Sequence, residues 1–214
     1  MIAIIDYEAG NLNSVYKALE LAAKKSGLKT DICITSSVKK IKEADAIVFP
    51  GVGAFGEAMK NLKKYKLVQP IRDAVNSKKP FLAVCVGLQL LFDKSYEKGT
   101  HKGLGIFKGE VKKFDLPSKY KIPHMGWNSV EVGKKDCALF KNIPKDSFFY
   151  FVHSYYVETK DRRINKIYSK YGKKFAAGIC KDNVYAVQFH PEKSQTQGLK
   201  LLENFCRIVK RGKK

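Results

Sequence analysis

The first half of the chain alternates short apolar runs with longer segments in which apolar residues recur at helical spacing. Nearly continuous apolar runs are typical of parallel strands buried on both faces, and the segments between them have the pattern of covering helices. This alternation predicts an α/β fold with an open, mostly parallel sheet and helices on both faces. A helix capped by Asn13 or Ser14 and ended by Gly27 follows the first strand. The strands are predicted at 2–5, 31–35, 46–49 and 81–84, and three further helices at about 56–64, 67–77 and 88–92.

Beyond Gly103 the pattern changes to short strands separated by Gly, Pro and Asn. This pattern predicts an antiparallel or mixed extension of the sheet, followed by an amphipathic helix over about 196–210. The chain has no internal repeat, linker or low-complexity block, so we expect a single domain over residues 1–214. The strands of the extension are predicted near 105–114, 127–132, 148–157, 165–169, 174–180 and 184–189.

The composition is that of an ordinary globular protein. Hydrophobic residues make up 44% of the 214 residues and charged residues 29%. The N-terminal apolar run is too short for a signal peptide, and no later run approaches the length of a membrane span. We therefore expect a cytoplasmic protein without a membrane partner.

The net charge of +21 raises the question of nucleic-acid binding. However, only five of the 41 basic residues are Arg, and the lysines are dispersed along the chain. Arg is the residue suited to bidentate recognition of phosphates and bases. A dispersed lysine excess predicts a solvated surface, and we expect no nucleic-acid partner.

The five cysteines, at positions 33, 85, 137, 180 and 206, form no CxxC pair and no Cys/His spacing typical of a metal site. An odd, scattered set predicts reduced thiols, most of them small core residues, and neither a metal nor a cofactor is expected.

Cys85 is the exception because of its context. It follows the predicted strand 81–84, lies between Ala83 and Gly87, and precedes a predicted helix. Small residues on both sides allow the sharp turn of a nucleophile elbow, and the N–H dipoles of the helix favour the reactive thiolate. A buried core cysteine after a strand is the alternative explanation.

A candidate base lies more than a hundred residues later, where His190, Pro191 and Glu192 follow a predicted strand. The imidazole of His190 can reach the carboxyl end of the sheet, and the Glu192 carboxylate can orient it toward a thiol. Taken alone, the His-Pro-Glu sequence is more typical of a surface loop.

A glycine-rich turn follows the predicted strand 46–49. Gly51 and Gly53 flank Val52, which allows the N–H of Val52 to turn toward a developing oxyanion. The N–H of Val86 would be the second donor. An ordinary glycine turn is the alternative, and no GK[ST] follows, so this is not a phosphate loop.

The order of these three segments resembles the class I (triad) glutamine amidotransferase family. The resemblance implies a flavodoxin-like core, a catalytic triad of Cys85, His190 and Glu192, and glutamine as the substrate. It further implies that Cys85 forms a thioester and releases ammonia, and that water then releases glutamate. A non-enzymatic relative with a degenerate site would lack one of the three residues, and all three are present.

Within this family the chain resembles, essentially end to end, the glutaminase subunits of imidazole glycerol phosphate synthases. The resemblance implies that Gln89 and Glu97 hold the main-chain groups of glutamine and that the segment His153, Ser154 and Tyr155 lines its other side. The matching segments are DYEAGNL (6–12), PGVGAF (50–55), QLLF (89–92), PHMGWN (123–128), FVHSYY (151–156) and QFHPEKSQ (188–195).

The same resemblance implies a heterodimer with a TIM-barrel cyclase, in which the ammonia is used to make imidazole glycerol phosphate and an aminoimidazole carboxamide ribotide in histidine biosynthesis. Asn11 and Trp127 would lie at this contact, although Trp127 on its own also fits a core aromatic residue. Similar glutaminase subunits that supply ammonia to an amidotransferase making surface amino sugars would carry the same catalytic residues. The sequence leaves that second role open.

Overall fold

A computed structural model describes residues 1–133 and 137–212. Its centre is a five-stranded parallel core in the order β2-β1-β3-β4-β14, which is the flavodoxin-like order and confirms the predicted sheet. The apolar runs form its strands because both faces are covered, and β1 is buried at every residue. The core strands are β1 (Ile2–Ile5), β2 (Ile32–Thr35), β3 (Ala46–Gly51), β4 (Phe81–Cys85) and β14 (Val184–Val187).

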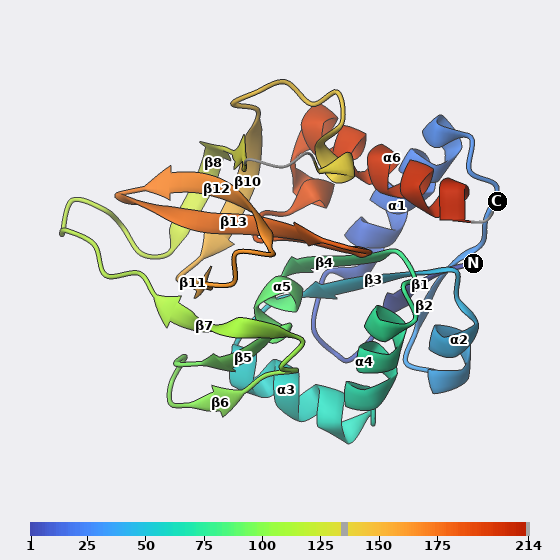
Figure 1. Ribbon diagram of the computed structural model, residues 1–214, viewed down its shortest axis with the longest axis horizontal. Coiled ribbons are helices and arrows are strands. Elements are labelled where there is room, and N and C mark those ends of the chain that lie inside the picture. Colours follow the sequence, from blue (N-terminus) through green and yellow to red (C-terminus); the bar gives the residue numbers. More distant parts are fainter. Residues whose placement is uncertain (134–136, 213–214) are drawn as a thin grey trace.

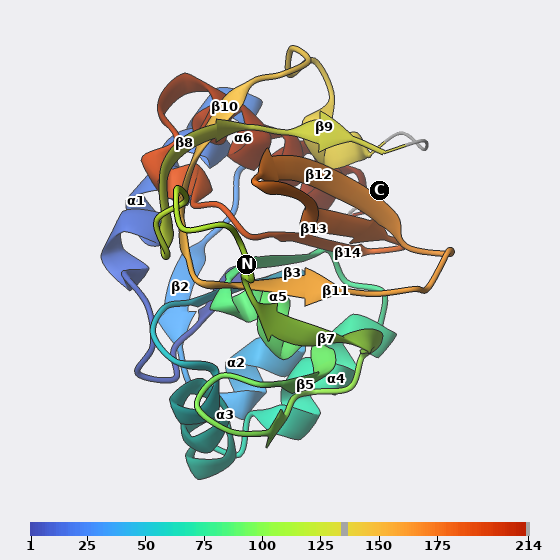
Figure 2. The same ribbon diagram turned by 90° about the vertical axis from the view of Figure 1, so that its left-hand side faces the viewer.

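Helices cover both faces of this core, as the two ribbon views show (Figures 1 and 2). The helices α1 (Leu12–Ser26) and α6 (Gln195–Gly212) lie together on one face. The opposite face carries α2 (Val38–Glu43), α3 (Phe55–Lys64) and α4 (Val68–Asn76).

The start of α1 differs from the prediction. The side chain of Asn11, rather than that of Asn13 or Ser14, caps the helix by accepting a hydrogen bond from the Ser14 N–H at 3.4 Å. Gly27 ends the helix in the left-handed conformation, as expected. The predicted cap was wrong because the helix begins at Leu12, which packs against the core from its first turn.

The extension beyond the parallel core is mixed, as predicted. It continues from β14 in the order β13-β11-β7-β5-β6; off this path, β12 pairs with β13, and β9 pairs with β12. Among these contacts only β5 with β7 is parallel. The strands are β5 (Phe92–Ser95), β6 (His101–Lys102), β7 (Phe107–Lys113), β9 (Glu131–Val132), β11 (Tyr155–Glu158), β12 (Asn165–Tyr171) and β13 (Lys173–Lys181).

Three predicted elements are divided in the structure. The predicted helix 88–92 is the short α5 (Val86–Leu90), and Phe92 already belongs to β5, where it packs on Phe107 of the parallel neighbour β7. The predicted strand 127–132 divides into β8 (His124–Ser129) and β9, and the predicted strand 148–157 divides into β10 (Phe148–His153) and β11. In each case the first part belongs to a separate two-stranded sheet, formed by β8 and β10, and the second part belongs to the large sheet. The 3-10 turns η1 (Ala138–Phe140) and η2 (Pro191–Lys193) complete the described elements.

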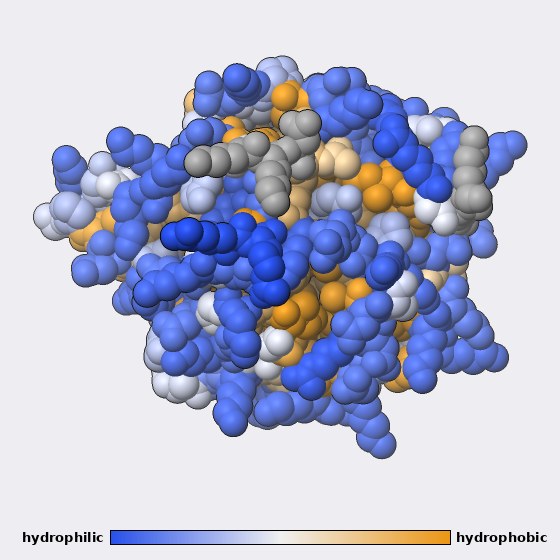
Figure 3. All heavy atoms as spheres, viewed as in Figure 1, coloured by the Kyte–Doolittle hydropathy of each residue, from blue (hydrophilic) through white to orange (hydrophobic). Residues whose placement is uncertain are grey.

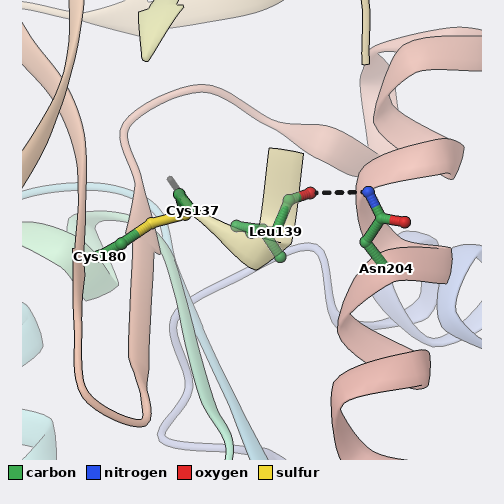
Figure 4. Close-up of a disulfide and its surroundings, with 4 residues drawn as sticks. All are labelled: Cys137, Leu139, Cys180 and Asn204. Carbon is green, nitrogen blue, oxygen red and sulfur yellow. Dashed lines mark hydrogen bonds between the residues drawn. A yellow bond between two sulfur atoms is a disulfide. The ribbon is translucent and has the colours of Figure 1, made fainter. Parts of the chain in front are cut away.

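A disulfide between Cys137 and Cys180 corrects the expectation that all five cysteines are reduced (Figure 4). The bond ties the start of η1 to the end of β13, across 43 residues of sequence. The same turn is also fixed from α6, because the Asn204 side chain donates to the Leu139 carbonyl at 2.9 Å. The spacing of these two cysteines matches no disulfide motif, so their pairing depends on the tertiary fold.

Hydrophilic residues cover most of the face shown in Figure 3, and hydrophobic residues appear there in separate spots. This distribution is typical of a surface in contact with water. None of the helices in residues 1–133 and 137–212 combines the length and apolar character that a membrane crossing requires.

Candidate active site

Cys85 is the last residue of β4 and the residue immediately before α5. Its backbone has φ 56° and ψ −113°, a conformation that non-glycine residues rarely adopt, and its side chain is buried. Gly87 is required beside it, because a Cβ at that position would clash with the carbonyl oxygen of Phe49. The predicted strand-to-helix turn is therefore present, with the strained nucleophile position that such an elbow needs.

His190 follows β14, the parallel neighbour of β4, so the turn after each strand lies at the same edge of the sheet. Its backbone is fixed on both sides, because its N–H donates to the Tyr150 carbonyl at 2.9 Å and its carbonyl accepts from Ser194 Oγ at 2.6 Å. The Nδ1 atom of His190 lies 2.7 Å from Glu192 Oε1, and both side chains are about 95% buried, at 4% and 5% exposure.

This contact leaves His190 Nε2 as the free nitrogen of the ring. It is buried and makes no hydrogen bond to any residue that the structure describes. Burial disfavours the charged ring, but contact with Cys85 and Glu192 outweighs burial and raises the pKa of His190 well above its ordinary value. The pair is therefore suited to an imidazolium beside a thiolate.

The glycine turn lies opposite the nucleophile. Gly51 pairs with Cys85 in the register of β3 and β4, which places Val52 just beyond the edge of the sheet. Gly51 has no room for a side chain, because a Cβ there would clash with the Tyr7 hydroxyl and lie 3.0 Å from the Gly87 nitrogen. The Tyr7 hydroxyl is buried and donates to the Pro50 carbonyl at 2.8 Å, which fixes the start of the turn.

A cavity of about 210 Å³ opens onto Cys85. Its small size suits a ligand such as a single amino acid rather than a larger cofactor. Larger hollows occur elsewhere on the described surface, such as one of about 780 Å³ between β9 and β12, but Cys85 does not line it. All five predicted substrate-binding residues line the cavity; its wall consists of Gly53, Cys85, Val86, Gln89, Glu97, Pro123, Val152, His153, Ser154 and Tyr155.

Comparison with known proteins identifies the family to which this site belongs. A sequence model of the glutamine amidotransferase class-I family matches residues 3–209. The chain belongs to the class-I glutamine amidotransferases. The imidazole glycerol phosphate synthase subunit HisH of Aquifex aeolicus is 50% identical to this amidotransferase over 204 residues, covering 95% of each chain. The subunit of the same name from Rhodopirellula baltica is 46% identical over 206 residues, covering 96% of this chain and 97% of that protein.

The fold of the amidotransferase agrees with that of a solved glutaminase structure. The glutaminase domain of CTPS from Trypanosoma brucei superposes with a TM-score of 0.70, covering 98% of this chain and 93% of that one. The two sequences are 17% identical, so this likeness concerns the fold alone.

Two predicted substrate-binding residues of the amidotransferase are fixed by hydrogen bonds. Glu97 Oε2 accepts from the N–H of Phe55, at the first turn of α3, at 2.7 Å. Gln89 Nε2 donates to the Tyr155 carbonyl at 3.1 Å and to Gln188 Oε1 at 3.0 Å. Both side chains are thus held in place at the wall of the cavity.

A pair of buried histidines supports the other wall of the cavity. His153 Nδ1 lies 2.8 Å from the Tyr155 carbonyl, and its Nε2 lies 2.9 Å from His124 Nδ1. Because a carbonyl only accepts, His153 carries its proton on Nδ1 and accepts from His124. His124 Nε2 then accepts from the Asn128 amide at 3.2 Å. Burial lowers the pKa of His124 to about 4 and that of His153 to about 3, so both rings are neutral at pH 7.

The outer face of the β8–β10 sheet is apolar and exposed. Met125, Trp127 and Phe148 are 66%, 45% and 57% exposed, and Trp127 packs against Tyr150 of the partner strand. The interpretation of Trp127 as a core aromatic is therefore wrong, and its exposure is consistent with a partner contact. Asn11 is also exposed, at the start of α1.

Three buried polar side chains near the site were not anticipated as functional from the sequence: Tyr7, His124 and Gln188. Each lies within a segment that the family resemblance had already marked, but its partner comes from a distant segment. For Gln188 the available signal is a polar residue directly after a buried apolar strand, whereas Tyr7, between Asp6 and Glu8, and His124, the first residue of β8, carry no such signal.

Proposed function

We propose that this chain is the glutaminase subunit of an imidazole glycerol phosphate synthase, a single domain over residues 1–214 that hydrolyses glutamine for histidine biosynthesis. The observation that carries the proposal is the convergence of an elbow cysteine, Cys85, which lines an amino-acid-sized cavity, and a buried His190–Glu192 pair that follows the neighbouring strand at the same edge of the sheet. The relatives named as subunits of that synthase, matched over almost their whole length, support this choice within the family.

In the proposed reaction Cys85 Sγ attacks the side-chain amide carbon of glutamine. The imidazolium of His190 gives its Nε2 proton to the amide nitrogen, which leaves as ammonia while the thioester forms. His190 Nε2 then takes a proton from water, the hydroxide attacks the thioester, and glutamate leaves as the thiolate is restored. Glu192 holds Nδ1–H throughout and keeps Nε2 directed at the reacting atoms.

Backbone N–H groups would stabilise the charge that develops on the amide oxygen. The proposed donors are the N–H of Val52, which follows Gly51, and the N–H of Val86, which directly follows the nucleophile. Gly53 has φ 85° and lines the cavity, so the turn places backbone rather than side chains next to the ligand. Gln89 and Glu97 would hold the main-chain groups of glutamine, opposite the wall formed by residues 153–155.

The partner is proposed to be a TIM-barrel cyclase that docks on the outer face of the β8–β10 sheet, with Trp127 and Asn11 at the contact. Trp127 is an exposed aromatic residue of the type that anchors interfaces. Val152 connects the docking face to the site, because it lies on β10 and also lines the cavity. Ammonia released at Cys85 would thus pass to the partner without entering water, where most of it would become unreactive ammonium.

We also propose a cytoplasmic location. Disulfides are uncommon in that reducing compartment, so the state of Cys137 and Cys180 in the cell, bonded or reduced, tests the location, and a reduced pair would support it. Non-reducing mass spectrometry of protein alkylated at the moment of cell lysis measures the two states directly.

The test of the proposed function uses the purified heterodimer with a cyclase subunit. Cys85→Ala should abolish glutamine-dependent turnover while leaving the cyclase reaction with added ammonium salts intact, and Cys33→Ala, at a free cysteine on β2, should retain both. Glutamine hydrolysis that persists in Cys85→Ala would refute the triad. Failure of the wild-type chain to support growth of a subunit-deficient strain without histidine would favour the role in surface amino-sugar synthesis.

A further inference from the structure

Gln188 lies directly after β14 and has no solvent exposure. Its backbone N–H donates to the Ala177 carbonyl of β13 at 2.8 Å, which fixes the residue at the edge of the sheet. Because β14 is the parallel neighbour of β4, the side chain of Gln188 reaches the end of β4. Its Nε2 atom lies 3.6 Å from Cys85 Sγ. A fully buried amide with a polar atom next to the nucleophile requires an explanation.

The direction of this contact is fixed by one backbone carbonyl. The Tyr155 carbonyl can only accept, so the atom of Gln89 that lies 3.1 Å from it is the amide nitrogen. The same nitrogen lies 3.0 Å from Gln188, so the Gln188 atom that faces it must be the acceptor, Oε1. Nε2 of Gln188 is the atom left to face the sulfur. The chain of hydrogen bonds therefore ends with an N–H directed at Cys85.

We infer that Gln188 is a further catalytic residue, whose side-chain N–H donates to the Cys85 sulfur and stabilises its thiolate. This inference rests on the proposed role of Cys85 as the nucleophile. A donor to the charged form of a group lowers its pKa, and the thiolate is the form that attacks the amide carbon. The same donor favours the return of the electron pair to sulfur when water cleaves the thioester.

The role is distinct from that of His190. His190 Nε2 has to exchange protons with the substrate and with water, and it makes no hydrogen bond to a described residue. The Gln188 amide has no proton to give up and acts as a fixed dipole throughout the cycle. A merely structural Gln188, which only oriented Gln89, would affect the binding of glutamine and leave the reactivity of the sulfur unchanged.

Two substitutions separate these roles. Gln188→Met keeps the length of the side chain and removes both its donor and its acceptor. Gln188→Glu keeps the acceptor for Gln89 and replaces only the donor, placing a carboxylate oxygen against the sulfur. The readout is the pH dependence of Cys85 alkylation by iodoacetamide in the full chain, followed by mass spectrometry of the Cys85 peptide, with the free thiol of Cys33 as the internal reference.

The midpoint of Cys85 alkylation should rise by about one pH unit in Gln188→Met and by more in Gln188→Glu, while that of Cys33 stays fixed. The value of kcat for glutamine hydrolysis at pH 7 should fall about tenfold, and in Gln188→Glu the KM for glutamine should change less than about twofold. An unchanged midpoint in Gln188→Glu, or a loss of activity confined to KM, would overturn the inference.

The alkylation readout does not require turnover. Failure of the proposed function, seen as hydrolysis by Cys85→Ala, is therefore distinguishable from failure of this inference. If Gln188→Met does not fold, Gln188→Glu alone decides, because it retains the hydrogen bond from Gln89.

Discussion

The buried His124–His153 pair predicts that this amidotransferase loses stability in mild acid. Both rings are neutral in the folded protein, since burial lowers the pKa of His124 to about 4 and that of His153 to about 3. In the unfolded chain both titrate near the ordinary value of about 6.5. The unfolded state therefore takes up two more protons as the pH falls below that value, and the stability that the neutral pair contributes is lost progressively toward pH 4.

The size of the effect follows from the same pKa values. As the pH falls below about 6.5, each ring that stays neutral in the folded protein while its unfolded counterpart is protonated lowers the free energy of unfolding by about 1.4 kcal/mol per pH unit. Between pH 7 and pH 5 this amounts to about 2 kcal/mol for each histidine and about 4 kcal/mol for the pair. His190 does not add to this loss, because its raised folded-state pKa gives stability that is fully present below about 6.5 and is lost only as the pH rises.

The assay is urea unfolding at pH 7 and pH 5, which keeps most carboxylates ionised. In wild type the free energy of unfolding should fall by about 4 kcal/mol between the two, and in His124→Gln by about half of that. His101→Gln, on β6 and outside the pair, serves as the matched control and should show the wild-type fall. An equal fall in wild type and His124→Gln would refute the assignment of the acid sensitivity to the pair.

Three further predictions follow from single contacts. Gly87→Ala should abolish activity and lower the yield of folded protein, because the added Cβ would clash with the Phe49 carbonyl. An activity assay and a thermal melt check this, and a variant that is both active and stable would contradict the elbow geometry. Cys137→Ser should lower the free energy of unfolding under oxidising conditions by up to about 4 kcal/mol, the loop-closure value for a 43-residue separation, and leave glutaminase turnover unchanged. In urea unfolding, this difference should disappear when both proteins are reduced, and a loss that persists would point to packing rather than the bond. Trp127→Ala should weaken binding of the cyclase partner by about tenfold or more, measured by calorimetry, without changing the rate of glutamine hydrolysis by the isolated chain. An unaltered affinity would show that the β8–β10 face is not part of the interface.

The sequence was sufficient to predict the parallel core and the position of Cys85 for a physical reason. A strand buried on both faces shows as a continuous apolar run, as in 81–84, and the turn after it is marked by a small residue such as Gly87. Chemistry at the end of such a strand lies at a known edge of the sheet, so His190 after one strand and Cys85 after another were expected to meet. Their neighbouring positions in the structure follow from the order of the strands.

The contacts that were not predicted depend on register and on distant partners. The hydrogen bond from Gln188 to the sulfur requires β14 to pair with β4, which apolar patterning alone cannot specify. The bond between Cys137 and Cys180 likewise depends on where η1 lies against β13. The cap at Asn11 was missed for a local reason, since three nearby polar residues each fit the capping role and packing of Leu12 decides among them.

Successive side chains of β8 point to opposite faces of the β8–β10 sheet. This alternation explains why one short segment carries both an exposed aromatic residue and hydrogen-bonded polar residues. Trp127 lies on the outer face of the strand, exposed, whereas His124 and Asn128 lie on the inner face, hydrogen-bonded toward the cavity. The inner chain of hydrogen bonds reaches the Tyr155 carbonyl, which also accepts from Gln89. A displacement of β8 along its axis would therefore move the proposed docking residues and the support of the glutamine-binding wall together. For this reason a substitution on the outer face has to be judged by two measurements, the affinity for the cyclase partner and the rate of glutamine hydrolysis by the isolated chain. A lost contact lowers only the affinity, whereas a shifted strand also changes the rate.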